Sequence, residues 1–506
     1  MEPAKRIIVN TTAQYIKAFV NIGLSLYSTR LVLDALSISD FGIYSVVGGV
    51  VAMLGFITNG LVITTQRYIS FFHGRGDRSF VGKVFTNSLF LHIIFGLAIS
   101  LILFLIKGWL FGGILNIPVP RLETAGYVYL ITIVMLFVTI VTAPFKALFI
   151  ARENIVFVSV VEVCDGIIKL IFAIALTYVT SDRLIVYAFL MCSIQVLNFL
   201  AFSLYGRLRF EECKIRIRRR DIANDIIRQL MGFAGWTIYS MGTLAAKNQG
   251  LAIVINHFVG TVANAAYGVA AQIDSAIMFV SSSIVNAMNP QIMQAEGGGD
   301  RKRVLMLAGQ ESKYSTILLS LAAIPILSEL PELLSVWLKE VPENTVMFCS
   351  FALATCLVDQ VTIGLNAVNR AQGKIGLYTL VMFTPKLLCL PISWWLLQTG
   401  HSLISVMWVI LIVEATTSAA RIPFLIITAG LSITTYMRYT VLPLLPPICS
   451  LLLFCWGFTH ILHFPYRFLL TIPLSVIFGL IVVWAFSLQS AERQFIVKIL
   501  KTKLKT

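Results

Sequence analysis

Several ionisable residues of this 506-residue chain lie within long apolar stretches, where they are costly and therefore informative. A charged side chain at the centre of a bilayer costs at least ~2.5–3.5 kcal/mol on insertion scales, so such a residue is expected to face a partner or a wet cavity. The residues of this kind are Lys17, Arg30, Glu162, Asp165, Lys169, Lys247, Asp274, Asp359, Lys386, Glu414 and Arg421. We take them as the candidates for substrate binding and ion coupling.

Two of the cations head polar stripes on otherwise apolar helices. At 100° per residue, Lys17 shares a helical face with Asn21, and Lys247 shares one with Trp236 and Ser240. Because a helix that faces lipid would not carry such a stripe, we predict that both helices line one watery substrate cavity. The cations suit a phosphate or an acidic sugar, and the indole of Trp236 could stack on a sugar ring. The alternative is that both lysines reach along the helix to the membrane interface.

Acidic side chains form a second group of candidates. Glu162, Asp165 and Lys169 are spaced i, i+3 and i+7, which places them on one helical face. If one acid pairs with the lysine, the other is left to bind a proton or a sodium ion. A purely structural triad is the alternative.

Three further acids occur singly in later apolar stretches. Asp274, Asp359 and Glu414 are ion-coupling candidates as well, and each could instead pair with Lys386 or Arg421.

One charged pair suggests a latch. Arg30 and Asp34 lie four residues apart near the end of the first apolar stretch, so they predict either an ion pair or a gate at the outer mouth. The eight cysteines form no CxxC motif and no Cys/His cluster, so the sequence predicts neither a metal site nor a disulfide framework. No cofactor is expected beyond a coupling proton or sodium ion.

The elements that position these residues follow from composition. The chain is 58% hydrophobic and only 12% charged, whereas soluble domains carry roughly 25% charged residues. A spanning helix needs about 20 apolar residues, and the apolar stretches are too long and continuous for barrel strands. The sequence predicts an all-α, polytopic membrane protein with about 14 transmembrane helices, at 13–33, 41–66, 84–106, 125–145, 155–180, 184–205, 229–255, 264–290, 310–330, 346–366, 375–398, 404–430, 441–462 and 468–488.

The positive charges indicate orientation rather than nucleic-acid binding. The net charge is +15, but the Lys and Arg residues lie between apolar stretches instead of on one basic domain. Placing the N-terminus in the cytoplasm puts most of the loop cations on the cytoplasmic side, so both termini are predicted to be cytoplasmic. The basic segment 206–228 is expected to bind anionic membrane lipids.

The chain also repeats itself. Tyr44 to Asp77 and Tyr267 to Asp300 both read as a turn, a long span and a Gly-Asp turn, 223 residues apart. A second match at an offset of 220 residues joins ARENIVFVS to AQGKIGLYT. Six spans separate the copies, so the halves have the same orientation. We predict a six-helix bundle over 1–205, a cytoplasmic linker over 206–228, a second bundle over 229–430, and two additional helices with a basic tail over 431–506, which look like an appendage.

These features resemble a known superfamily. The motifs D-F-G-I-Y (Asp40 to Tyr44) and A-N-A-A-Y-G (Ala263 to Gly268), interpreted as turns, and the small-residue helices after them are similar to those of multidrug/oligosaccharidyl-lipid/polysaccharide (MOP) exporters. Within that superfamily the chain is most similar to polysaccharide transporters of the O-antigen flippase type. The resemblance implies two MATE-like bundles around a cavity and movement of an undecaprenyl-pyrophosphate-linked oligosaccharide across the bacterial cytoplasmic membrane. It also implies a polysaccharide polymerase and glycosyltransferases as partners.

Other function classes fit less well. A multidrug antiporter of the same fold should have an acidic, aromatic cavity, whereas cations head both stripes here. A membrane polymerase or ligase needs a sizeable outside loop with catalytic groups, and the longest outside loops, 107–124 and 331–345, are short. A passive scaffold of an export complex would not need polar stripes inside its bundles. The sequence therefore favours a transporter over an enzyme.

Overall fold

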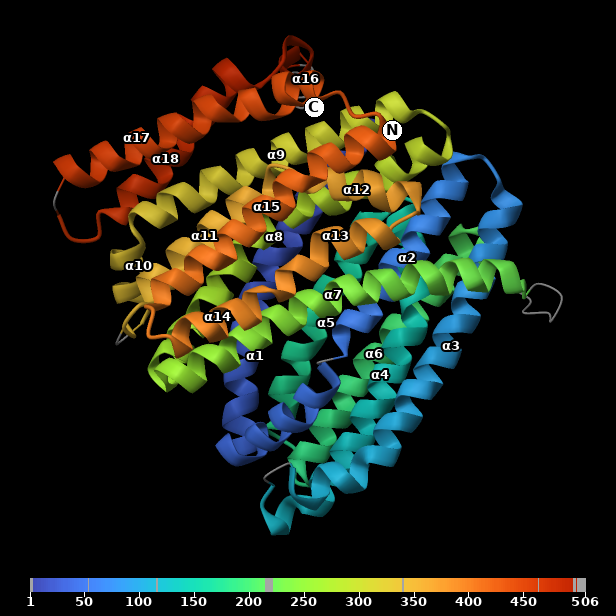
Figure 1. The fold of residues 1–506 in the computed structure, drawn as a ribbon. Coiled ribbons are helices and arrows are strands. Elements are labelled where there is room, and N and C mark those ends of the chain that lie inside the picture. The colour runs from blue at the N-terminus through green and yellow to red at the C-terminus, as the bar shows by residue number, and fades with distance from the viewer. Residues whose placement is uncertain are drawn as a thin grey trace. The chain divides into compact units, whose positions relative to one another are not determined.

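The computed structural model consists of α-helices, and no strand occurs in the part of the chain that it describes (Figure 1). That part comprises residues 3–52, 54–114, 117–213, 222–338, 341–462, 464–494 and 497. Within it, eight helices are long and apolar enough to cross a membrane, or ten if two sharply bent pairs each form one span. The predicted all-α, multi-pass class is confirmed, and the predicted total of 14 spans is consistent with these helices.

The chain divides into two compact units, which we describe separately. Unit 1 comprises Met1–Gly242 and Met293–Gly299, and unit 2 comprises Thr243–Ile292 and Asp300–Thr506. The division falls within α7 (Asn224–Val259) and α8 (Thr261–Gly297), so the first part of α7 and the last turns of α8 belong to unit 1. The boundaries predicted at 205, 228 and 430 stay predictions. Residues 214–221 of the basic segment and most of the basic tail lie outside the described residues.

Unit 1 is a helical bundle. Its α1 packs along α5, and α4 packs against both α3 and α6. The ribbons of α3, α4 and α6 run side by side in Figure 1. A buried apolar core of Val, Leu, Ile and Ala side chains joins α1, α3, α4, α5 and α6. The helices are α1 (Pro3–Ala52), α2 (Gly55–Gly74), α3 (Arg78–Trp109), α4 (Leu122–Ala151), α5 (Ile155–Leu176), α6 (Arg183–Arg209) and the first part of α7 (Asn224–Val259).

The two motifs that we interpreted as turns are helical, so that interpretation is wrong. Asp40 to Tyr44 lies inside α1, which continues to Ala52, because residues 24–39 include no Gly or Pro that would end the helix before this motif. In the second half the chain turns at Gly260, whose φ of 101° suits glycine. The motif Ala263–Gly268 forms the first turns of the following helix.

Unit 2 holds the remaining helices. The segment between α9 and α10 bends by 78° and that between α11 and α12 by 48°, so each pair can form one broken span. The helices are the second part of α7, most of α8 (Thr261–Gly297), α9 (Arg301–Ser328), α10 (Leu330–Trp337), α11 (Thr345–Gln360), α12 (Ile363–Gln372), α13 (Gly376–Leu387), α14 (Cys389–Gln398), α15 (Leu403–Ala429), α16 (Ile433–Tyr436), the π-helix η5 (Met437–Val441), α17 (Leu445–Ile461) and α18 (Phe468–Val482).

The two additional helices are an integral part of unit 2. Figure 1 shows α17 and α18 alongside α9, against which both pack. Lys313 on α9 binds Glu492 at 2.6 Å, and Glu329 after α9 binds Arg467 at 2.8 Å. The middle and the C-terminal end of α9 are therefore tied to the C-terminal segment, which is more than an appendage.

The predicted repeat is visible in the backbone. Gly76 and Gly299 have φ of 79° and 78°, and the aspartate after each accepts a hydrogen bond at 3.0 Å from the backbone N–H three residues later. At the second match, Glu153 and Gly373 both have positive φ, of 57° and 82°. Equivalent positions of the two halves thus adopt the same local conformation.

Candidate functional site

A cavity of about 330 Å³ lies in unit 2 between α7, α8, α11 and α15. Aromatic and aliphatic side chains form much of its wall, as in most small-molecule sites. Its principal polar lining residues are Lys247, Asn248, Gln249, Asn264, Tyr267 and Asp274.

The cavity combines one cation with one acid among its described lining residues. Lys247, which the sequence assigned to a substrate cavity, lies here half-buried. Asp274, an ion-coupling candidate, accepts a hydrogen bond at 2.6 Å from the Cys356 thiol and interacts electrostatically with Lys247. The structure therefore brings two separately chosen residues to one site.

The motif that carried the family resemblance contributes to the same cavity. Asn264, Tyr267 and Gly268, all from A-N-A-A-Y-G, line it. The Tyr267 ring packs edge-on against Phe348, with 5.7 Å between the ring centroids. This packing holds the phenol in the wall of the cavity.

Next to the cavity, three buried charges and the half-buried Asp359 form two ion pairs. Lys386 binds Glu414 at 2.5 Å, and Arg421 binds Asp359 at 2.5 Å. Lys386 also interacts electrostatically with Asp359, so the two pairs form one cluster. Cys356, the donor to Asp274, interacts electrostatically with both carboxyls of the cluster. Asp274, Asp359 and Glu414 are thus neighbours, which their positions in the sequence did not indicate.

In unit 1 the predicted stripe on α1 meets α5. Lys17 binds Glu162 at 2.7 Å, and Lys146 on α4 binds the other oxygen of that carboxyl at 2.6 Å. The amide of Asn21 donates to the backbone oxygen of Glu162 at 3.2 Å. Pairing between helices therefore accounts for this part of the stripe, and a role of Lys17 and Asn21 in a substrate cavity stays a prediction.

The predicted triad on α5 has several partners. Asp165 accepts a hydrogen bond at 2.9 Å from Asn198 on α6. Lys169 is exposed and interacts with Asp165 only electrostatically among the contacts that the structure describes. Glu162 instead binds the two lysines on α1 and α4, so the acids on α5 link their helix to three others of unit 1, α1, α4 and α6.

The remaining cavity candidates lie on the unit 1 part of α7. Trp236 is half-buried and packs edge-on against Tyr239, with 6.0 Å between the ring centroids. Ser240 is buried and donates to the backbone oxygen of Thr237 at 2.7 Å. Both share α7 with Lys247, which belongs to unit 2. A single cavity that contains all three stays a prediction.

A different ion-pair network occupies the end of unit 1 where a latch was expected. The side chain of Arg30 lies outside the described part, and Asp34 is exposed. Arg121 instead binds Asp40 at 2.9 Å and Asp182 at 2.8 Å. Burial alone would raise the pKa of Asp182, but its hydrogen bonds, foremost that from Arg121, hold this pKa below its usual range. Asp182 and Asp40 lie 61 and 81 residues from Arg121 in the sequence, so helical spacing could not reveal these pairs.

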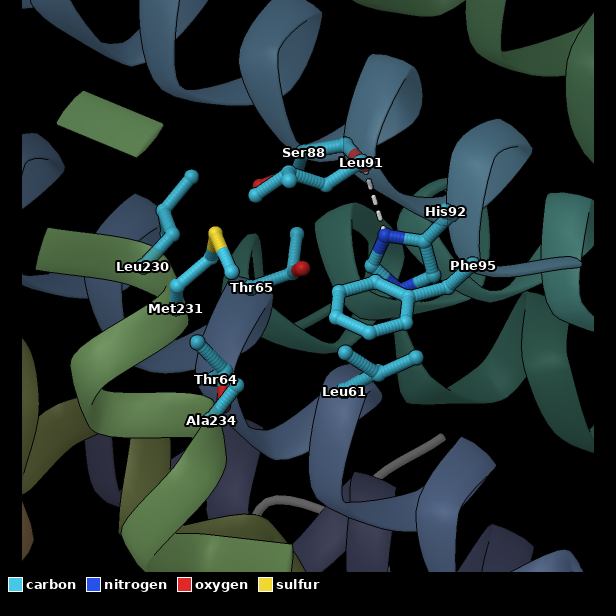
Figure 2. Close-up of a pocket in the computed structure, with 10 residues that line it drawn as sticks. All are labelled: Leu61, Thr64, Thr65, Ser88, Leu91, His92, Phe95, Leu230, Met231 and Ala234. Carbon is cyan, nitrogen blue, oxygen red and sulfur yellow. Dashed lines mark hydrogen bonds between the residues drawn. The ribbon is translucent and has the colours of Figure 1, made fainter. Parts of the chain in front are cut away.

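A much smaller cavity lies in unit 1 around His92, which sequence analysis had not selected (Figure 2). The ring is 2% exposed, and its Nδ1 lies 2.6 Å from the backbone oxygen of Ser88. Figure 2 shows Thr65 of α2 across the cavity from the ring. Its volume of about 10 Å³ holds roughly one water molecule, which excludes a substrate.

Comparisons with known proteins identify the architecture. No protein-family model and no curated protein sequence matches the chain. Solved structures do match: a MATE mutant has a TM-score of 0.74 at 14% identity and covers 85% of this chain and 97% of its own. A MOP superfamily transporter from Pyrococcus furiosus gives 0.71 at 13%, covering 85% and 96%. A mutant of the Vibrio cholerae MATE transporter VcmN gives 0.68 at 16%, covering 83% and 95%.

The chain has a MATE-like transporter fold. This confirms the predicted fold class, including the expected likeness to MATE proteins. At 13–16% identity the likeness concerns the fold, so the chemistry of the MATE-like chain has to be argued from its own residues.

Proposed function

We propose that this protein is a flippase that moves an undecaprenyl-pyrophosphate-linked oligosaccharide, the repeat unit of an O-antigen or capsule, across the cytoplasmic membrane by alternating access. The observation that carries the proposal is the cavity of unit 2, which Lys247 lines as its one cation among the described lining residues. A lysine ammonium forms strong, charge-assisted hydrogen bonds with phosphate oxygens. The side-chain amides of Asn248, Gln249 and Asn264 can donate to and accept from sugar hydroxyls.

The size of the cavity limits what it can hold. A volume of about 330 Å³ is at the lower end of the range for ligand pockets. It accommodates a phosphate group or a single sugar rather than a whole oligosaccharide. We therefore assign to it one part of the lipid-linked head group.

A multidrug antiporter is the second candidate, and Asp274 favours it. An acid in the cavity wall suits an organic cation, and one neighbour in fold is a multidrug resistance MATE family transporter. The Pyrococcus furiosus transporter, in contrast, is described as having a binding pocket of reversed polarity that suggests a different function. The fold thus accepts both polarities. Because Asp274 is engaged by the Cys356 thiol, we give more weight to Lys247.

An ion gradient is the proposed energy source. The candidates for binding a proton or sodium ion remain Asp274, Asp359 and Glu414 in unit 2, and Glu162, Asp165 and Lys169 in unit 1. The proposed setting is the inner membrane of a bacterium with both termini in the cytoplasm. There the basic segment 206–228 would meet anionic lipids, and a polymerase and glycosyltransferases would act on the same glycan.

Substitution of Lys247 tests the proposal. In cells that depend on this protein for a surface glycan, Lys247→Ala should abolish the polymer while the protein still reaches the membrane, and Lys247→Arg should retain most of it. Lys302→Ala, which removes an exposed lysine in the first turn of α9, is the matched control. Normal polymer in Lys247→Ala would contradict a cationic substrate site. Ethidium efflux that depends on Asp274 and not on Lys247 would favour the multidrug candidate.

A further inference from the structure

The helix α9 is unusually polar for a buried transmembrane element. Six polar side chains along it are at most 1% exposed: Glu311, Ser312, Lys313, Ser315, Thr316 and Ser320. Burial of polar groups is costly unless they are hydrogen-bonded. Each of these side chains therefore calls for a partner.

Most of the charged and hydroxyl groups have one. Lys313 binds Glu492 at 2.6 Å, Ser312 accepts from the backbone N–H of Gly364 at 3.0 Å, and Thr316 donates to its own helix at 2.7 Å. Glu311 differs: neither of its carboxyl oxygens has a hydrogen-bond partner among the described residues. It is a carboxyl group enclosed by protein with no donor to stabilise its charge.

The elements around α9 supply few groups that could act on Glu311. Arg370 on α12 and Tyr436 on α16 interact with it electrostatically. The other titratable or charged groups on the elements packed against α9 are Cys349, Cys356 and Asp359 on α11, Glu332 on α10, Arg438 and Tyr439 on η5, and Cys449, Cys455 and His460 on α17. Asp359 is bound to Arg421, and α18 carries no titratable group.

We propose that Glu311 is a proton-binding site of unit 2. An ionised carboxylate without a hydrogen-bond donor is strongly disfavoured in a medium of low dielectric constant, and such a group takes up a proton instead. The reaction is the uptake of one proton by the carboxylate, which gives the neutral acid.

The packing of α9 against α12 suggests how this proton is used. A Cβ added to Gly364 on α12 would lie 2.0 Å from the backbone oxygen of Ala308 on α9, so the two helices touch backbone to backbone. Glu311 lies one turn beyond this contact on α9. Separation of the helices would admit water to the carboxyl and release the proton, and closure would require its uptake. This use of the proton rests on the proposed transport function, whereas the presence of the proton does not.

Infrared spectroscopy of the purified full chain in detergent tests the site without any substrate. At pH 7 the wild type should show a protonated-carboxyl C=O band that shifts in D₂O, and Glu311→Gln should lose that component. Glu329→Gln is the matched control, because Glu329 is equally buried but bound by Arg467 through both oxygens at 2.8 and 2.9 Å, so it should be ionised. Its replacement should leave the band unchanged.

Three results would overturn the proposal. The first is a spectrum of Glu311→Gln in which the protonated-carboxyl band is the same as in the wild type. The second is loss of this band when sodium chloride is added at fixed pH, which would indicate a sodium site. If Glu311→Gln does not fold, Glu311→Asp decides instead, because it keeps a carboxyl and should show a displaced acid band. The third is an unmoved band in that variant. A failure of glycan transport would leave these spectra valid, and a failure of the spectra would leave the test of Lys247 untouched.

Discussion

The ion pair between Lys386 and Glu414 should be the most costly contact to break in unit 2. Each side chain is 6% exposed, and the atoms lie 2.5 Å apart. Lys386→Met would leave the Glu414 carboxylate buried without its partner, in a cluster that also contains the Asp359 carboxylate. Because the desolvated charge loses its partner, we expect a large loss of stability from this single substitution.

The expected magnitude follows from burial. Removing one partner of a buried ion pair costs about 3–5 kcal/mol, whereas replacing both partners by neutral groups is often close to neutral. Lys386→Met and Glu414→Gln should each destabilise by that amount, and the double variant should cost less than either. For a unit of this size the single substitutions correspond to a fall in melting temperature on the order of 10 °C.

A double-mutant cycle measures the effect. Thermal unfolding of the purified protein in detergent would be followed for the wild type, both single variants and the double variant, with Lys169→Met as the exposed control. The coupling between the two sites should therefore exceed about 3 kcal/mol. Additive effects, or single variants as stable as the control, would refute the reasoning and would show that water reaches the pair.

Two further predictions concern unit 1. The pKa of Asp182 is lowered in the folded protein, so its ion pair with Arg121 stabilises the fold above the unfolded pKa, and this stabilisation is lost as the pH falls through the folded pKa. Asp182→Asn should therefore lower the melting temperature at pH 7 and make it less dependent on pH between about 5 and 3. A melting temperature that depends on acid pH as in the wild type would contradict this. A Cβ at Gly74 would lie 1.9 Å from the backbone oxygen of Gln294, so Gly74→Ala should destabilise the protein. Gly23→Ala is the control, because a Cβ at Gly23 meets open space and should not destabilise it. Equal melting temperatures of the two variants would contradict the close contact at Gly74.

The composition and the internal sequence repeat predicted the architecture because each averages over many residues, so no single residue decides the result. The apolar stretches predicted an all-helical membrane protein, and the two Gly-Asp turns proved to have the same backbone conformation, at Gly76 and Gly299. The position of the first turn was less predictable. The segment around Asp40 has the small and aromatic residues of the expected motif, but without a helix-breaking residue before it α1 continues.

The candidate site was only partly predictable, because helical spacing reports on one helix at a time. Lys247 and Asp274 were selected separately as buried charges, and only the fold places them in one cavity. The partner of Lys17, Glu162, is 145 residues away and was expected to act with Asp165 instead. Glu311 was not selected because it lies in a helix with many polar residues, where a charge is not costly unless other helices cover it.

Translocation of a lipid-linked oligosaccharide by the reconstituted protein tests the central claim most directly. Proteoliposomes would carry a fluorescent undecaprenyl-pyrophosphate-linked oligosaccharide, and a membrane-impermeant glycosidase outside would report its arrival in the outer leaflet. We predict that the wild type accelerates cleavage of the inner-leaflet pool and that Lys247→Ala returns it to the rate of protein-free vesicles. Wild-type vesicles that cleave no faster than empty ones, while the same protein moves ethidium, would contradict the account.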